Sequence, residues 1–336
     1  MLAAWTLLGV SLVVILLGCD LFTNGIEWAG KKLDLGEGAV GSVLAAVGTC
    51  LPETLIAILA IVFGARHGQG ADVGIGAILG APLMLSTLAF CVTGAAVLVF
   101  ARLRRRTALM TVNHRVLGRD LRYFFMVFGL SAAASFLPRL AKPAVAALLV
   151  LLYGTYIRQT FADNDGAGGA EEISPLHFHR STGEPPLWLV LGQSVAGVGV
   201  LVLGAHLFVG ELTAISIDTG ISTLVLSLIL TPVATELPEK FNSVLWVRQR
   251  KDTLALGNIS GAMVFRSSIP PAIGMLFTPW VLDDRALACV AVAVVSTAVA
   301  WAEMTWRPRL SPWSLLLGGP FYLFYLAWVF RWLPGM

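Results

Sequence analysis

The chain has 336 residues, of which 57% are hydrophobic and only 13% are charged, and its mean hydropathy is +0.81. Soluble domains carry about 25% charged residues, so this composition excludes a soluble globular protein and predicts a polytopic membrane protein embedded in a lipid bilayer. The formal net charge of +3 does not indicate nucleic-acid binding, because the basic residues lie in loops between apolar segments. The four cysteines lie within apolar segments and lack the spacing of a metal site, so we expect neither disulfides nor a bound cofactor.

Ten apolar runs reach the length of about 20 residues that crosses a bilayer as a helix. They are predicted at 3–23, 38–64, 71–100, 121–138, 141–160, 187–209, 218–247, 253–279, 286–304 and 312–332. The longest polar stretch, 162–186, divides them five and five, so residues 161–186 are expected to link two halves, 1–160 and 187–336. Residues 16–19 (LLGC) resemble a lipoprotein cleavage box, but no basic residue precedes them, so we expect an uncleaved first span.

The loop charges predict the orientation. Sixteen Lys and Arg residues lie on the side of the loops after spans 1, 3, 5, 7 and 9, whereas five lie on the opposite side. Because cytoplasmic loops carry the excess of basic residues, we expect the first side in the cytoplasm, with linker 161–186, and both termini outside. Without a large cytosolic insert, the chain is expected in the plasma (inner) membrane of a prokaryote. The HFH sequence at 177–179 has no third metal ligand nearby and is expected to be solvated linker.

A charged stretch, Leu230–Ser243 (LTPVATELPEKFNS), interrupts the seventh apolar run. Each buried charge costs roughly 2.5–3.5 kcal/mol at the centre of a membrane helix, so Glu236, Glu239 and Lys240 need an explanation. Carboxylates beside a proline-induced helix break are typical of an ion or substrate path, because water and freed carbonyls share the cost. The alternative is that these residues lie at a membrane surface and merely end a helix.

This stretch has a counterpart in the first half. Residues 47–53 read VGTCLPE and residues 233–239 read VATELPE, each in the second span of its half. A second pair follows, GAILGA at 76–81 and GNISGA at 257–262. Because each half has an odd number of spans, the halves have opposite topology. We therefore predict an all-α membrane protein of ten helices, built as two inverted five-helix repeats with broken helices that meet at the midplane, as in many secondary transporters.

The small residues of the second pair have a packing explanation. Glycines four residues apart permit the close approach of two membrane helices. We expect this role for Gly76, Gly80, Gly257 and Gly261.

The first pair of motifs can form a cation site. Thr49 lies four residues before Glu53, as Thr235 does before Glu239, so each pair shares one helix face. Inverted symmetry would bring Glu53 and Glu239 together, and carboxylates, hydroxyls, carbonyls and water form the irregular oxygen cage that suits Ca²⁺. Without a cation the two like charges favour protonation, so exchange of a metal for protons or for sodium follows.

These segments resemble the two alpha repeats of the cation/calcium exchanger superfamily, in particular those of prokaryotic sodium/calcium exchangers. The family pattern is G-T-S-L-P-E followed by G-N-x-x-G-S-N-x-x-N/D in each half. This chain has GTCLPE and GAILGAPLML, then ATELPE and GNISGAMVFR. The resemblance covers essentially the whole chain, with alpha segments at about 38–100 and 218–279. It implies an antiporter that works by alternating access, in which Thr49, Glu53, Thr235 and Glu239 surround Ca²⁺.

The departures from the family pattern concern oxygen ligands. Family serines, amides and acids are replaced by Cys50, Ala81, Pro82 and Leu85 in the first half and by Glu236, Ala262, Met263 and Arg266 in the second. Among the amides only Asn258 survives. In the family these lost oxygens help to form sodium sites. We therefore expect exchange of Ca²⁺ for Na⁺, with Ca²⁺/H⁺ exchange as the alternative and a transport-inactive sensor or scaffold as an alternative of another class.

Arg266 is the sharpest departure, because an arginine cannot deprotonate and has to pair with a carboxylate such as Glu53, Glu236 or Glu239. One hypothesis is that its guanidinium takes the place of a coupling cation. The other is that it extends to a vestibule and has no role. The predicted cation-binding residues are thus Thr49, Glu53, Thr235, Glu236, Glu239 and Asn258, with Glu53 and Glu239 as metal ligands and Arg266 as a tethered counter-charge. No nucleophile is spaced with a base, so we expect no enzyme.

Overall fold

The computed structural model describes residues 2–32, 54, 57–61, 70–163, 174–179 and 183–331, without the side chains of residues 2, 70, 163 and 233–242. The described chain is helical, and its isolated β bridge joins Met110 to Leu310. Six of its helical stretches are long and apolar enough to cross a membrane. Most of the predicted second span, 38–64, lies outside the described residues, and the number of ten helices stays a prediction.

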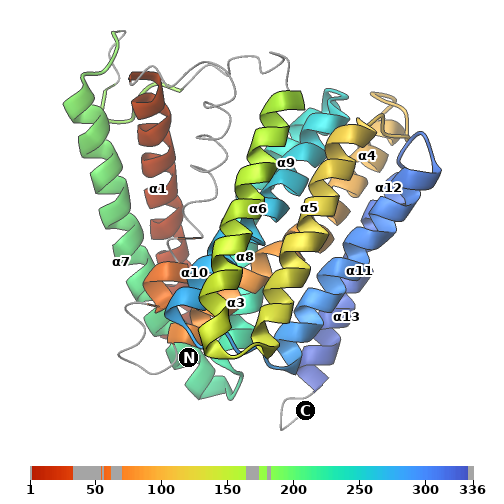
Figure 1. Cartoon of the computed structure of the whole chain (residues 1–336). Coiled ribbons are helices and arrows are strands. Elements are labelled where there is room, and N and C mark those ends of the chain that lie inside the picture. Colours follow the sequence, from red (N-terminus) through yellow and green to blue (C-terminus); the bar gives the residue numbers. More distant parts are fainter. Residues whose placement is uncertain are drawn as a thin grey trace.

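The helices follow the predicted spans in chain order (Figure 1). They are α1 (Leu2–Lys32), α3 (Gly70–Met84), the π-helical turn η2 (Leu85–Ala89), α4 (Phe90–Arg102), α5 (His114–Ala133), the short 3₁₀ turns η3 (Ala134–Phe136) and η4 (Arg139–Ala141), α6 (Lys142–Asp163), α7 (Leu187–Thr219), α8 (Thr223–Arg248), α9 (Asp252–Arg266), α10 (Ile269–Phe277), α11 (Asp284–Trp306), α12 (Pro312–Leu316) and α13 (Gly318–Arg331).

Three boundaries differ clearly from the prediction. Helices α1 and α7 continue well beyond residues 23 and 209, and α5 begins before residue 121 because Asn113 caps it by accepting from the backbone N–H groups of Arg115 and Val116.

Helices α1 and α7 pack along each other and stand to one side of the remaining bundle (Figure 1). Their shared core contains Ile15 of α1 and Leu201 and Phe208 of α7. Glycines allow the close approach: a Cβ atom at Gly18 would lie 2.8 Å from the backbone nitrogen of Leu201. A separate and larger core joins α3 to α6 with α8 to α13.

Part of the linker docks onto this pair of helices. Leu176 is buried in a small core with Trp28 of α1 and Val190 of α7. The Trp28 indole donates to the carbonyl of Ser174 at 2.9 Å, and the imidazole Nε2 of His177 lies 2.9 Å from a carboxylate oxygen of Asp20. His177 and Phe178 are exposed, as expected for a solvated linker, whereas Leu176 beside them is buried and anchors this part of the linker to α1 and α7.

Helix α3 packs against α8 through the first pair of predicted small residues. A Cβ atom at Gly76 would lie 2.6 Å from the carbonyl oxygen of Leu224, and one at Gly80 would clash with the carbonyl of Leu228. The Leu228 carbonyl is the one that Pro232, which lacks an N–H group, leaves without its helical donor. The packing role is confirmed for Gly76 and Gly80.

The second pair of glycines makes no such contact within the described residues. A Cβ atom at Gly257 would have no neighbour within 4 Å, and one at Gly261 would lie 3.4 Å from the hydroxyl of Tyr156. The segment that would face them by repeat symmetry is the predicted second span, so their packing role stays a prediction.

Two helical stretches lose regular α geometry at equivalent places. The π turn η2 interrupts the path from α3 to α4, and Ser267 and Ser268 separate α9 from α10. When the motifs at 76–81 and 257–262 are aligned, Leu85 corresponds to Arg266, so η2 falls opposite the break after α9. Helix α8, in contrast, passes through Pro232 and Pro238 as one helix, so the break expected there is wrong.

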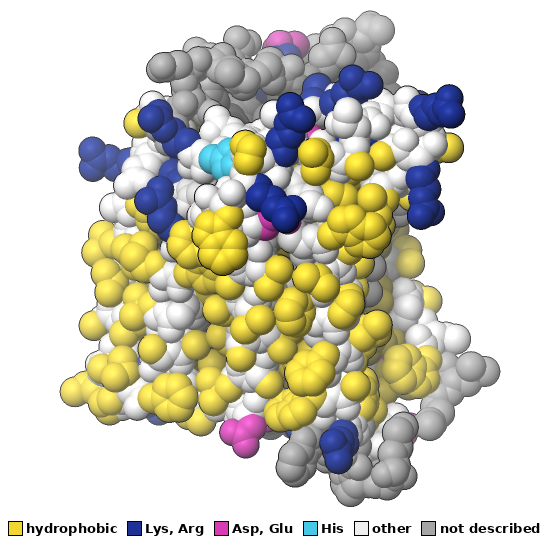
Figure 2. Space-filling model, turned by 90° about the vertical axis from the view of Figure 1, so that its right-hand side faces the viewer, with side chains coloured by type: hydrophobic (Ala, Val, Ile, Leu, Met, Phe, Trp, Pro, Cys, Tyr) yellow, Lys and Arg dark blue, Asp and Glu magenta, His cyan; other side chains and the backbone are white. Residues whose placement is uncertain are grey.

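The molecular surface fits a membrane-spanning protein. Figure 2 shows a band of hydrophobic side chains below an edge along which Lys and Arg gather. A bilayer requires such a band, and lipid headgroups favour the basic edge.

Candidate functional site

The predicted cation site lies mostly beyond what the structure describes. Thr49 and Glu53 are outside the described residues. Thr235, Glu236 and Glu239 belong to α8, but their side chains are not described. Asn258 and Arg266 are described, and both lie on α9. The structure therefore shows the helices α8 and α9 that carry the second half of the predicted site, and of its side chains only those on α9.

Arg266 ends α9 in the interior of the bundle. Its side chain is 1% exposed, and Ser267 and Ser268, which follow it, are completely buried. The Arg266 side chain therefore does not reach solvent in this structure, and its role as a tethered counter-charge stays a prediction. Because an arginine stays protonated even when buried, Arg266 places a permanent positive charge inside the protein.

The break after Arg266 has a cause in the sequence. Helix α10 begins with Ile269, Pro270 and Pro271. The two prolines have no N–H group and cannot donate to the carbonyls of Arg266 and Ser267, four residues earlier. The break thus leaves backbone carbonyl oxygens without their helical donors, and irregular helices of this kind can contribute such oxygens to an ion.

Accessibility falls along one face of α9. Side chains four residues apart share a helix face, which here holds Leu254, Asn258, Ala262 and Arg266. Leu254 and Asn258 are exposed, Ala262 is half-buried and Arg266 is buried. The amide of Asn258 is accordingly accessible at the surface of the described structure, whereas Arg266 is shielded.

The first half offers apolar side chains at the corresponding positions. Ala81 and Leu85 are buried, and so is Met263 in the second half. The hydroxyls of Ser86 and Thr87 in η2 both donate to the carbonyl of Leu83 in the preceding turn. These hydroxyls are therefore used within their own helix.

The two serines that follow Arg266 differ in the hydrogen bonds of their hydroxyl groups. Ser268 donates to the carbonyl of Val264 at 2.7 Å, whereas the buried hydroxyl of Ser267 has no hydrogen-bond partner among the described residues. Nothing in the sequence distinguishes these two serines from each other. The structure identifies Ser267 as the hydroxyl that remains for a water molecule or an ion.

A buried ion pair fixes the beginning of α9. Arg106 forms a bidentate pair with Asp252, at 2.6 and 2.9 Å, and also donates to the carbonyl of Val247 at 2.9 Å. The backbone N–H of Thr111 donates to the same carboxylate. Arg106, which counts among the loop charges, is thus not a solvated residue but ties the loop after α4 to the turn between α8 and α9.

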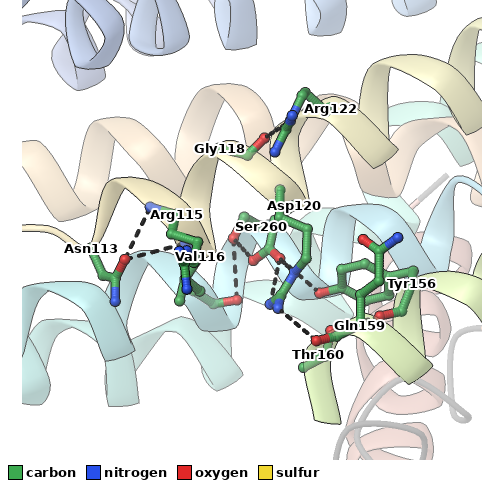
Figure 3. Close-up of polar contacts among 12 residues, drawn as sticks. Asn113, Arg115, Val116, Gly118, Asp120, Arg122, Tyr156, Gln159, Thr160 and Ser260 are labelled. Carbon is green, nitrogen blue, oxygen red and sulfur yellow. Dashed lines mark hydrogen bonds and ion pairs between the residues drawn. The ribbon is translucent and has the colours of Figure 1, made fainter. Parts of the chain in front are cut away.

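A second buried carboxylate contacts the middle of α9 (Figure 3). Asp120 of α5 is 2% exposed, and its Oδ2 accepts a hydrogen bond from Ser260 at 2.6 Å. Its Oδ1 accepts from the hydroxyl of Tyr156 at 3.1 Å and from the neighbouring guanidinium of Arg119 at 3.2 and 3.3 Å. Sequence reasoning missed Asp120, because it lies just before the predicted span 121–138 and reads as a loop charge.

No cluster of three or more His, Cys, Asp or Glu side chains forms a metal site within the part of the chain that the structure describes. The predicted carboxylates Glu53, Glu236 and Glu239 are not among the side chains that this statement covers. What α9 and the break after it contribute in the described region is an exposed amide, a buried positive charge and an unbonded hydroxyl.

Comparison with known proteins shows the family to which the chain belongs. The profile of the sodium/calcium exchanger protein family matches residues 3–161 and 189–331. The chain belongs to this family. Membership agrees with the resemblance seen in the two motif pairs and places the protein in a family of multi-pass membrane transporters.

Two relatives align with this exchanger-family protein over most of both chains. Inner membrane protein YrbG of Escherichia coli (strain K12) is 24% identical over 340 residues, 98% of each chain. The putative antiporter CaxA of Alkalimonas amylolytica is 25% identical over 91% of each chain.

Solved structures share the fold. The H⁺/Ca²⁺ exchanger CAX superposes with a TM-score of 0.68 at 15% identity, covering 97% of this chain and 82% of its own. The sodium–calcium exchanger NCX_Mj, soaked with Na⁺ and Sr²⁺, superposes with a TM-score of 0.57 at 20% identity, covering 96% and 97%. The exchanger fold of the present chain follows from these superpositions.

Proposed function

We propose that this protein is a secondary-active antiporter that moves Ca²⁺ across the membrane in exchange for another cation by alternating access. Glu53 and Glu239 would coordinate Ca²⁺ directly, with oxygens from Thr49, Thr235 and Asn258 completing an irregular cage of the kind that Ca²⁺ accepts. The observation that carries the proposal is the burial of Arg266 at the end of α9. A permanent charge inside the bundle requires anionic partners, and the predicted carboxylates would supply them.

We further propose that protons drive the exchange, although sodium was the first expectation from the family resemblance. The positions at which the family has additional oxygens hold the buried apolar residues Ala81, Leu85 and Met263. Sodium binds oxygen ligands, and these side chains have none. Arg266 adds a positive charge that neither leaves nor titrates.

The formal charges support the same coupling. Three carboxylates, those of Glu53, Glu236 and Glu239, with the guanidinium of Arg266 give a site charge of about −2. One Ca²⁺ or about two protons neutralise this charge, so with either load the protein can switch access to the site from one side of the membrane to the other at low electrostatic cost.

The test is ⁴⁵Ca²⁺ uptake into proteoliposomes under an imposed pH gradient or an imposed Na⁺ gradient. We expect uptake with the pH gradient and none with sodium alone. Glu53→Gln and Glu239→Gln should each abolish this uptake. Uptake that requires sodium would favour the sodium exchanger, and the absence of Ca²⁺ movement under both gradients would favour a transport-inactive scaffold.

We also propose that the protein lies in the plasma (inner) membrane with both termini outside and residues 161–186 in the cytoplasm. The excess of Lys and Arg on the linker side supports this orientation. Single cysteines placed near residue 176 and near residue 280 should react with an impermeant thiol reagent from opposite sides. Labelling of both from one side would contradict the orientation.

A further inference from the structure

The carboxylate of Asp120 joins three helices in the interior of the protein. Asp120 belongs to α5, Tyr156 to α6 and Ser260 to α9, and all three side chains are buried. Figure 3 shows the hydroxyls of Tyr156 and Ser260 pointing toward the same carboxyl group. A carboxylate has about four lone-pair positions, and here they receive donors from different helices, so the contact fixes direction as well as distance.

The contact is made on the back of the site helix. Ser260 lies two residues after Asn258, and residues two apart on an α-helix point in nearly opposite directions. Asn258 is exposed, whereas Ser260 is completely buried against Asp120. The carboxylate therefore holds α9 from the side opposite to the amide that the cation would contact.

Aromatic residues of α6 extend the same contact toward Arg266. The hydroxyl of Tyr156 faces Gly261, the residue after Ser260. The ring of Tyr153 meets that of Phe265 edge-on, with centroids 5.4 Å apart. Phe265 directly precedes Arg266, so α6 and Asp120 support α9 over the length that separates Asn258 from Arg266.

We propose that Asp120 is a positioning residue of the exchanger: its hydrogen bonds to Ser260 and Tyr156 set the rotation and depth of α9. This inference rests on the proposed antiport function. A helix packed only by apolar side chains can rotate or slide by small amounts at little cost, whereas a charge-assisted hydrogen bond is directional. The ion pair between Arg106 and Asp252 fixes the start of α9. Asp120 fixes its middle, and together they determine where Asn258 and Arg266 lie.

The first test distinguishes a change in the placement of α9 from a loss of folded protein. Ser260→Ala and Tyr156→Phe each remove one donor to Asp120, and Thr160→Ala is the control, because the Thr160 hydroxyl donates to the carbonyl of Tyr156 in its own helix. In ⁴⁵Ca²⁺ uptake we expect Ser260→Ala to raise KM for Ca²⁺ by about three- to tenfold, since small displacements of binding groups have large effects. Thr160→Ala should leave KM unchanged. Asp120→Asn, which keeps an oxygen that Ser260 can donate to, should raise KM less than Asp120→Ala.

A merely structural role would lower the maximal rate with the amount of folded protein and leave KM unchanged. That result for Ser260→Ala and Asp120→Ala would overturn the inference. An altered preference for Ca²⁺ over Sr²⁺ in these variants, absent from Thr160→Ala, would support it.

The second test does not require transport. A single cysteine replaces Asn258 in a background without the native cysteines, and its reaction rate with an impermeant maleimide is measured in oriented membranes. Ser260→Ala should change this rate by about threefold or more, because the exposed face of α9 turns; an unchanged rate would contradict the proposal. If the wild-type protein moves no Ca²⁺, the proposed function fails, and the labelling rate still decides whether Asp120 positions α9.

Discussion

The π turn η2 and the break after Arg266 occupy equivalent places in the two halves but differ in chemistry. In the first half Leu85 is buried, and the hydroxyls of Ser86 and Thr87 bond their own helix. In the second half the buried Arg266 stands at the position of Leu85, and the hydroxyl of Ser267, the next residue, has no partner among the described groups. The two halves thus share the irregular backbone, while the second half carries a charge where the first carries a leucine.

Two neighbouring helices contact the backbone of the first irregular segment. The hydroxyl of Ser296 on α11 donates to the carbonyl of Ser86 at 2.6 Å, and Gly318 of α13 packs directly against the carbonyl of Thr87. These contacts close the first segment with protein groups. The comparison teaches that in the first half the hydroxyls at this level are bonded within their own helix, whereas the second half has a buried charge and a hydroxyl, that of Ser267, without a hydrogen-bond partner among the described residues.

The largest effect is expected from transferring the charge between the halves. Leu85→Arg would place a guanidinium in a packed apolar site, at a cost of about 4–5 kcal/mol if no carboxylate reaches it. We expect the purified protein to lose thermal stability or not to fold. Leu85→Met, which conserves volume, should cost less than about 1.5 kcal/mol. A stable Leu85→Arg protein would show that the first half also faces anionic groups.

Removing the charge from the second half should alter coupling. Arg266→Gln makes the site more negative, so Ca²⁺ and protons should bind more tightly and leave more slowly, lowering the maximal rate of pH-driven uptake. Arg266→Lys keeps a positive charge and should retain more activity. The measurement is the pH dependence of ⁴⁵Ca²⁺ uptake. Identical profiles for Arg266→Gln and wild type would remove Arg266 from the mechanism.

A smaller effect concerns the scaffold side of the comparison. Gly80→Ala would push a methyl group into the carbonyl of Leu228 and into Pro232, separating α3 from α8 at a cost of about 2–3 kcal/mol. Gly154→Ala is the control, because a Cβ atom there would meet no described atom within 4 Å. Thermal unfolding in detergent would measure both. Equal stability of the two variants would contradict the close approach of α3 to α8.

The smallest effect is expected at the contact that closes η2. Ser296→Ala leaves the buried carbonyl of Ser86 without this donor, which costs about 1–2 kcal/mol. Thr297→Val removes a hydroxyl that bonds a carbonyl of its own helix and should cost less. If Ser296→Ala unfolds at the same temperature as wild type, the π turn does not depend on α11.

The positions of most helices can be predicted from the sequence, whereas most of the buried polar contacts cannot. Apolar runs locate most of the described helices, and the repeated motifs alone identify the equivalent segments of the two halves. Hydropathy does not predict the extensions of α1 and α7, because the apolar run ends where the bilayer ends, although a helix can continue beyond it. The π turn was missed because Leu-Ser-Thr-Leu-Ala contains neither proline nor glycine to mark it.

Tertiary contacts explain the remaining differences. Arg106 and Asp120 read as loop charges, and only partners distant in sequence, Asp252 and Ser260, account for their burial. The break after α9, in contrast, was readable in principle from Pro270 and Pro271. Five predicted ligands stay predictions, because their side chains are not described: Thr49, Glu53, Thr235, Glu236 and Glu239.

The most direct test of the central claim counts protons against calcium. Proteoliposomes that contain a pH-sensitive dye and no sodium would take up ⁴⁵Ca²⁺ while the internal pH is recorded. If Arg266 holds the place of a coupling cation and leaves a site charge of about −2, about two protons should leave for each Ca²⁺ that enters. Calcium uptake that needs sodium and moves no protons would contradict the account.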